Sequence, residues 1–150
     1  MIIISPYSKQ LRSGKMNPKN YPYWKELIKL LSQENIIQVG ITEEQKLVDD
    51  FRKNLSLDEL LLLIKECKYW ISVDNFFPHL AHHVKKQGVV LFGYSDPKIF
   101  GYQENLNILK NRSLLRPNQF DTWENCVFNP NIFVKPDEII KQINEFFPTT

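Results

Sequence analysis

Short apolar runs alternate along the chain with segments whose apolar residues recur every three or four positions. The runs cover residues 2–4, 36–40, 69–73 and 89–92. Each run is nearly continuous in apolar side chains instead of alternating with polar ones, which is typical of strands buried on both faces of a sheet. We therefore predict a strand at each of these four positions.

Helical patterns and capping signals fill the segments between and after the runs. Ser56 followed three residues later by Glu59 forms a capping box, which marks the start of a helix. Thr42 is a second candidate cap, because acidic residues follow it and Lys53 stands at the other end, as the helix dipole favours. We predict helices over residues 21–33, 43–53, 57–67, 78–86 and 137–147.

The order of these elements predicts an α/β fold. Buried strands bounded by helices form a parallel sheet with helices on both faces, and right-handed crossovers then produce a single Rossmann-like domain. A chain of 150 residues suits one domain. Residues 111–136 are rich in Asn, Pro and aromatic residues, so we expect residues 111–150 to form a wrapping segment followed by a closing helix.

Composition and charge exclude several classes of function. Net charge is +2, with no large basic block of the kind that duplex nucleic acid requires, so no nucleic-acid partner is expected. The first residues lack a signal-peptide pattern, and no stretch of about 18 apolar residues is present to span a membrane. We expect a cytoplasmic protein whose Cys67 and Cys126 are reduced thiols, because neither belongs to a CxxC pair.

The candidate chemistry gathers at one predicted edge of the sheet. In open α/β sheets ligands bind outside the carboxyl ends of the strands. That rule brings together four short segments, SPYS at residues 5–8, GITE at 40–43, DN at 74–75 and GYSD at 93–96. Neither GxGxxG nor GxxxxGK[ST] occurs, and there is no nucleophile elbow, so the usual dinucleotide, P-loop and hydrolase signatures are missing from the sequence.

The stretch SVDNFFPHLAHH places one aspartate and three histidines within residues 72–83. Helical spacing puts His79 beside His82 or His83, but a zinc site needs a third ligand and no HExxH pattern is present. We favour a surface position for His82 and His83 and expect no metal and no cofactor. Asp74 has two interpretations, as a helix cap or as a ligand contact, and Asn75 is an alternative cap.

A basic loop leaves the first predicted strand at this edge. It carries Lys9, Arg12, Lys15 and Lys19, which are either solvated or able to meet a diphosphate together with Ser5 and Ser8.

Two further groups of side chains have alternative roles. Glu43 could accept a pair of ribose hydroxyls or could only favour a helix start through the dipole. The later aromatic residues are expected in the core rather than on a stacking platform; they are Phe120, Trp123, Phe128 and Phe133.

Three segments, taken in order, carry a family resemblance. They are ISPYSKQLRSGKMNPKNYPYW, IIQVGITEE and LSLDELLLLIKECKYWISVDNFFPHLAHHVKKQGVVLFGYSDP. In this order they resemble the C-terminal half of glycosyltransferase family 9, the heptosyltransferase-like enzymes. The resemblance covers roughly residues 2–110, and FVKPDEIIKQINEF is similar to the closing helix of that family.

The resemblance implies half of a GT-B fold, in which two Rossmann-like domains face each other across a cleft. The C-terminal domain of such enzymes binds the nucleotide-sugar, typically ADP-heptose, and the N-terminal domain binds the acceptor and supplies the proposed base. By motif, Asp74, Asn75 and His79 match residues that approach the phosphates and the sugar of the nucleotide-sugar. No catalytic residue is implied in this chain.

The same resemblance assigns the other candidate contacts. Ser5, Tyr7 and Ser8 match the loop after the first strand. Lys19, or alternatively Lys15, matches the lysine that neutralises the diphosphate. Glu43, or alternatively Thr42, lies where the family contacts the nucleoside.

Two departures from the family pattern leave three functions open. Phe76 stands where the family usually has glycine, and the acceptor domain is missing, so a free-standing half is expected. The chain is then the sugar-donor subunit of a split glycosyltransferase, completed by an acceptor-domain protein or by a homo-oligomer. Alternatively it binds a nucleotide diphosphate or nucleotide-sugar without turnover, as a sensor or sponge, or it is a decayed half used for protein interaction.

Overall fold

Six parallel strands form the sheet in the computed structural model, which describes residues 1–148. The strands are β1 (Ile2–Ser5), β2 (Ile36–Gly40), β3 (Phe51–Lys53), β4 (Trp70–Val73), β5 (Val89–Leu91) and β6 (Leu106–Ile108). Their order is β3-β2-β1-β4-β5-β6, and all neighbours pair in parallel. This is the Rossmann order, in which the topology reverses between β1 and β4.

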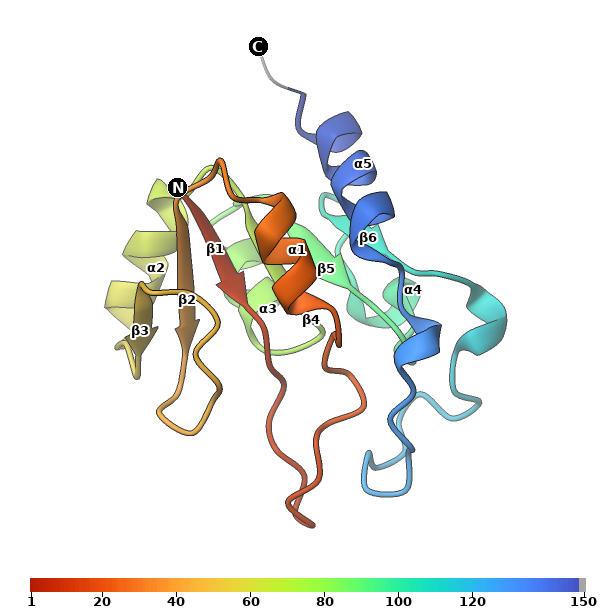
Figure 1. Cartoon of the computed structure of the whole chain (residues 1–150). Coiled ribbons are helices and arrows are strands. Elements are labelled where there is room, and N and C mark those ends of the chain that lie inside the picture. Colours follow the sequence, from red (N-terminus) through yellow and green to blue (C-terminus); the bar gives the residue numbers. More distant parts are fainter. Residues whose placement is uncertain (149–150) are drawn as a thin grey trace.

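Helices cover both faces of the sheet, as Figure 1 shows. They are α1 (Trp24–Leu30), α2 (Leu57–Glu66), α3 (Phe77–His83), α4 (Pro97–Phe100) and α5 (Pro136–Phe146), with 3₁₀ turns at Arg112–Leu114 and Pro130–Ile132. Successive side chains of a strand point to opposite faces. Ile2 and Ile4 therefore join the core under α1 and α5, whereas Ile3 joins the core under α2 and α3. The predicted α/β fold, with helices on both faces, is confirmed.

Local signals placed α2 and α5 correctly. Ser56 Oγ accepts a hydrogen bond from Glu59 N, and the Glu59 carboxylate accepts one from Ser56 N, which completes the predicted capping box. Helix α5 begins at Pro136 and packs beside α1, where Ile139 and Ile143 are almost fully buried. The closing helix is thus part of the core on that face.

The predicted helix over residues 43–53 is wrong. The chain forms turns after β2 and then the short strand β3, which pairs with β2. Gln38, fully buried on β2, explains the irregular path, because its side chain donates to Gln45 O at 2.9 Å and accepts from Leu47 N at 2.7 Å. Thr42 caps no helix here; its hydroxyl accepts a hydrogen bond from Asn54 Nδ2 at 2.7 Å.

Two further elements were not predicted, namely α4 and β6. Both are short, and β6 is only partly buried, so neither leaves a periodic pattern in the sequence. Cys67 and Cys126 are free thiols within the described residues.

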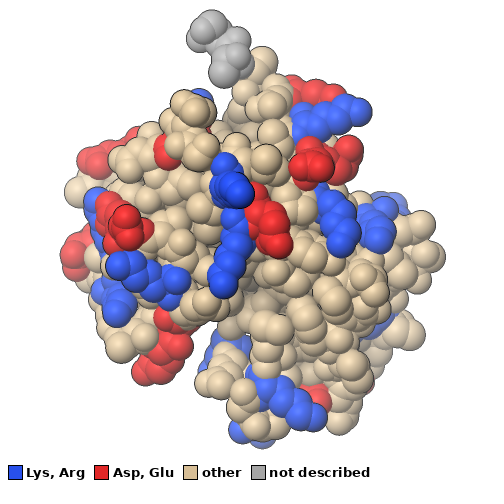
Figure 2. All heavy atoms as spheres, in the orientation of Figure 1, with Lys and Arg blue, Asp and Glu red and all other residues tan. Residues whose placement is uncertain are grey.

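The surface drawn in Figure 2 mixes positive and negative side chains on one face, without a large area of a single sign. Among residues 1–148, no helix is long and apolar enough to cross a membrane.

Candidate functional site

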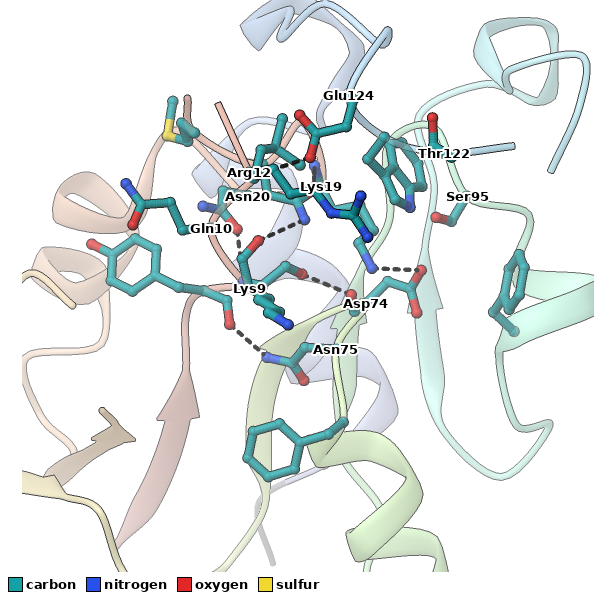
Figure 3. A pocket seen from close by; sticks show the side chains of 18 of the residues that line it. Lys9, Gln10, Arg12, Lys19, Asn20, Asp74, Asn75, Ser95, Thr122 and Glu124 are labelled. Atoms are coloured by element: carbon teal, nitrogen blue, oxygen red, sulfur yellow. Dashed lines mark hydrogen bonds and ion pairs between the residues drawn. The ribbon is translucent and has the colours of Figure 1, made fainter. Parts of the chain in front are cut away.

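An open cleft of about 1470 Å³ lies at the carboxyl ends of the strands. The loop after β1 (residues 6–20) forms one wall, and residues 119–124 form another. Figure 1 shows both segments extending beyond the carboxyl ends of the sheet. They meet where Arg12 N donates a hydrogen bond to the Glu124 carboxylate at 2.8 Å (Figure 3). The cleft is therefore closed at one end by segments that are distant in sequence.

Most of the candidate contacts identified from the sequence line this cleft. The lining includes Tyr7, Ser8, Lys19, Glu43, Asp74, Asn75 and His79. Ser5 instead lies buried at the end of β1 and lines a neighbouring cavity of about 320 Å³. Lys15 is exposed, and neither it nor Thr42 belongs to the lining, so the structure separates these two from the rest.

Lys19 and Asp74 face each other on the wall of the cleft. Lys19 Nζ lies 4.0 Å from Asp74 Oδ2, and their side chains are only 19% and 15% exposed. Burial lowers the pKa of Lys19, and Arg116 lowers it further, whereas Asp74 raises it. The ammonium is thus partly removed from water while still bordering the cleft, a setting in which a charge interacts more strongly with a ligand.

Ser8 and Asn75 hold the loops around this pair. Ser8 Oγ donates to Asp74 O at 2.8 Å. Asn75 Nδ2 donates to the carbonyl oxygens of Ser5 and Tyr7 at 3.3 and 3.2 Å. These bonds join the loop after β1 to the loop after β4, which brings Lys19 and Asp74 together.

The turn into α3 uses the side chain of Asn75, and not that of Asp74, as its hydrogen-bond acceptor. Phe77 N donates to Asn75 Oδ1 at 2.9 Å, so Asn75 accepts the hydrogen bond at this turn. The Asp74 carboxylate instead faces Lys19 and the cleft (Figure 3). Its position agrees with the ligand-contact interpretation.

The three histidines have different surroundings. His82 stacks on Tyr102 and contacts the Glu104 carboxylate, and both His82 and His83 are exposed, as expected from the sequence. His79 lines the cleft, and its Nδ1 lies 2.6 Å from the Tyr102 hydroxyl. Within residues 1–148 there is no group of three His, Cys, Asp or Glu residues placed to hold a metal ion.

The prediction that the late aromatic residues belong to the core is wrong for two of the four. Phe133 is fully buried and Phe128 packs against the core. Trp123 and Phe120 instead line the cleft, and Phe120 is 78% exposed. Residues 111–136 lack a periodic pattern, so no local signal distinguishes a core aromatic residue from one at the cleft.

Arg116 is a cation beside the cleft that sequence reasoning missed. Its guanidinium stacks on Trp123, with Cζ 3.5 Å from the ring centroid, and Lys19 Nζ lies 5.4 Å from the same ring. Burial lowers the pKa of Arg116, and the nearby Cys126, Asp121 and Asp74 oppose that shift. Two cations, Lys19 and Arg116, thus lie against Trp123, and such a local pair attracts the phosphates of an anionic ligand. The cleft lining as a whole carries more carboxylates (Glu43, Glu44, Asp74, Asp121 and Glu124) than cations (Lys9, Arg12 and Lys19).

Glu44 is a further lining residue, next to the predicted Glu43. A Cβ at Gly40 would lie 2.0 Å from Glu44 Oε2, so glycine at this position allows the carboxylate to fold over the end of β2. Burial raises the pKa of Glu44. Burial, and next the charge of Glu44, raise the pKa of Tyr7. Because no helix starts here, the dipole interpretation of Glu43 is wrong.

Phe76 separates the large cleft from the smaller cavity. Its side chain is 56% exposed and lines both spaces. The ring therefore borders both spaces.

The comparison with known families decides the classification. The model of glycosyltransferase family 9 (heptosyltransferase) matches residues 1–126. The chain belongs to glycosyltransferase family 9. No curated protein matches the sequence itself.

Solved heptosyltransferases share the fold at low sequence identity. ADP-heptose LPS heptosyltransferase II of E. coli is 17% identical with a TM-score of 0.68, and the match covers 98% of this chain and 46% of that one. Dodecameric, iron-containing TibC with ADP-D-β-D-heptose is 15% identical with a TM-score of 0.69, and the match covers 97% of this chain and 45% of that one. The heptosyltransferase WaaC of E. coli with ADP is 17% identical with a TM-score of 0.66, and the match covers 97% of this chain and 43% of that one. The family 9 chain described here thus spans less than half the length of these enzymes, the extent expected of one half of a GT-B fold.

Proposed function

We propose that this family 9 chain binds a nucleotide-sugar of the ADP-heptose class and serves as the sugar-donor half of a glycosyltransferase. The observation that carries the proposal is the Lys19–Asp74 pair, which borders an open cleft at the carboxyl ends of the strands. Two of the structural neighbours are described with ADP or an ADP-heptose bound. Acceptor binding is then assigned to another domain, because this chain matches less than half of each of those enzymes.

The charges suit a diphosphate flanked by hydroxyl groups. Lys19 would meet the phosphate oxygens, because a lysine ammonium forms strong charge-assisted hydrogen bonds with phosphate. The Asp74 carboxylate accepts hydrogen bonds only, and sugar hydroxyls are fitting partners for it. On the other side, Glu43 and Glu44, which line the cleft after β2, would accept hydrogen bonds from the hydroxyls of a ribose.

The chemical contribution of this half would be electrostatic. In glycosyl transfer from a nucleotide-sugar the diphosphate leaves with negative charge, and buried cations stabilise that charge as it develops. Bringing the acceptor hydroxyl into line is a positioning task for the other domain. We therefore assign no general base to this chain.

A calorimetric titration tests the proposal. Purified protein would be titrated with ADP, UDP, GDP and ADP-heptose, and any co-purified small molecule would be identified by mass spectrometry. Asp74→Ala and His79→Ala should each weaken binding of the recognised nucleotide-sugar by about 1–3 kcal/mol, the cost of a lost hydrogen bond to a charged group. His83→Ala, an exposed histidine outside the cleft lining, is the matched control.

The outcomes separate the competing functions. Binding followed by transfer in the presence of an acceptor-domain protein supports the split enzyme, whereas tight binding with the ligand recovered unchanged supports a sensor or sponge. Absence of binding to all four ligands contradicts the proposed function and leaves the protein-interaction role.

A further inference from the structure

Ser95 carries a buried hydroxyl for which the protein provides no partner. Its side chain is 1% exposed, and within residues 1–148 Ser95 Oγ makes no hydrogen bond. A buried polar group without a partner destabilises a folded protein, and most such groups are satisfied. Ser95 also lines the cleft, so the hydroxyl that the protein leaves unsatisfied borders the space that a ligand would occupy.

The backbone on both sides of Ser95 is held in place. Tyr94 O accepts hydrogen bonds from Arg116 N at 3.2 Å and from Gln119 Nε2 at 2.9 Å. Asp96 N donates to Gln119 Oε1 at 2.8 Å, and the Asp96 carboxylate forms a two-point pair with Arg112 at 2.9 and 2.8 Å. Ser95 is therefore presented by a rigid turn, as a preorganised ligand contact requires.

The sheet order determines which part of a ligand meets Ser95. Strand β4 lies between β1 and β5, so Asp74, directly after β4, lies between the loop after β1 and the turn after β5. Figure 3 shows Asp74 between the loop residues Lys9 and Arg12 on one side and Ser95 on the other. A diphosphate that meets Lys19 thus has the ends of β2 and β1 on one side and Ser95 on the opposite side.

We propose that the Ser95 hydroxyl forms a hydrogen bond with a hydroxyl group of the sugar in the bound nucleotide-sugar. The nucleoside lies toward the end of β2, where Glu43 and Glu44 line the cleft, and the sugar extends past Asp74 toward β5. This assignment rests on the proposed function, and it makes Ser95 a residue that distinguishes the nucleotide-sugar from the free nucleoside diphosphate.

The test compares free nucleoside diphosphates with the corresponding nucleotide-sugars, so that the two members of each pair differ only in the sugar. Wild type and Ser95→Ala would be titrated with ADP and ADP-heptose, and also with UDP and UDP-glucose and with GDP and GDP-mannose. The variant should bind the free diphosphate as wild type does and the matching nucleotide-sugar roughly five- to tenfold more weakly, the effect of one lost hydrogen bond. Ser113→Ala, an exposed serine outside the cleft lining, should change neither affinity.

The thermal midpoint of the ligand-free protein separates a ligand contact from a structural role. Because Ser95 Oγ has no partner in residues 1–148, Ser95→Ala should leave the midpoint unchanged or raise it. A lowered midpoint with an unchanged ratio of the two affinities overturns the proposal, as does an equal loss for both ligands or no loss for either. If wild type binds none of the six ligands, the proposed function itself fails and the sugar contact fails with it.

Discussion

Lys19 Nζ lies 4.0 Å from Asp74 Oδ2, although the two residues belong to different loops. They meet because β1 and β4 are neighbours in the sheet, and because Ser8 and Asn75 join the loops that follow these strands. The pair is located where the strand order reverses, the position at which open α/β sheets bind ligands. The neighbouring positions of β1 and β4 in the sheet therefore explain why these two opposite charges meet at the cleft.

Replacement of Lys19 tests which lysine meets the diphosphate. Lys19→Ala should weaken diphosphate binding by about 1.5–3 kcal/mol, because it removes a charge-assisted hydrogen bond in a partly buried position. Lys15→Ala should have little effect, since Lys15 is exposed and lies outside the cleft lining. Calorimetric titration of both variants measures the difference, and equal losses would contradict the assignment to Lys19.

The affinity for diphosphate should decrease at alkaline pH. Burial, opposed by Asp74 and reinforced by Arg116, lowers the pKa of Lys19, so this lysine loses its proton at a lower pH than an exposed one. Binding favours the protonated form, and affinity therefore falls as the pH rises through the lowered pKa. Titrations from about pH 7 to about pH 10 should show this fall in wild type. In Lys19→Arg the loss of affinity should move to a higher pH, because guanidinium stays charged. The same pH dependence in that variant would exclude Lys19 as the source of the effect.

Phe76 should contribute apolar contact to the bound ligand. Its ring is 56% exposed between the cleft and the smaller cavity, and a ligand that covers it removes this surface from water. Phe76→Ala should weaken binding by about 1–2 kcal/mol. Leu62→Ala, at a residue that is 60% exposed on α2, is the control. Tighter binding by Phe76→Ala would show instead that the ring obstructs the site.

Trp123 should report ligand binding by its fluorescence. Two of the three tryptophans, Trp24 and Trp70, are almost fully buried in the cores, and Trp123 lines the cleft. Nucleotide binding should therefore change the emission mainly through Trp123. A Trp123→Phe variant should lose most of the response on titration with the same ligand, and a full response in that variant would mean that binding is sensed elsewhere.

Glu44 should make the stability of the ligand-free protein depend on pH. Burial, reinforced by the charge of Glu43, raises the pKa of Glu44 above that of an exposed glutamate. The folded protein then holds its proton more tightly than the unfolded chain, so the free energy of unfolding decreases as the pH rises from the unfolded to the folded pKa.

Glu44→Gln removes this titration. Denaturant unfolding across the acidic range should show that stability falls less steeply in the variant than in wild type. Parallel pH profiles would contradict the burial of an ionisable carboxyl at this position, and Glu43→Gln, at the exposed neighbour, provides the comparison.

Predictions from the sequence succeeded where a local pattern has a single structural solution. The continuous apolar runs became β1, β2, β4 and β5, because a strand buried on both faces needs apolar side chains at every position. The capping box of α2 satisfies its own backbone groups and therefore depends little on the rest of the fold. The strand-end rule then placed Asp74, Asn75 and Tyr7 at one edge of the sheet.

The helix predicted over residues 43–53 failed for a complementary reason. Its capping and charge signals were favourable, but the buried side chain of Gln38 binds the backbone at Gln45 and Leu47 and holds an irregular loop instead. A hydrogen bond from a neighbouring strand outweighed weak helix propensity. Such a contact has no signature in the segment that it shapes.

The sequence by itself determined four of the six strands, the polar segments that follow them at one edge of the sheet, and the family resemblance, because short-range patterns and motifs carry this information. Only the tertiary structure decided that Lys19 rather than Lys15 faces Asp74, and that Trp123, with Arg116 stacked on it, lines the same cleft. The unsatisfied hydroxyl of Ser95 also became visible only there. These relationships join loops that are far apart in the chain, and their geometry depends on how the sheet, the loops and the wrapping segment pack together.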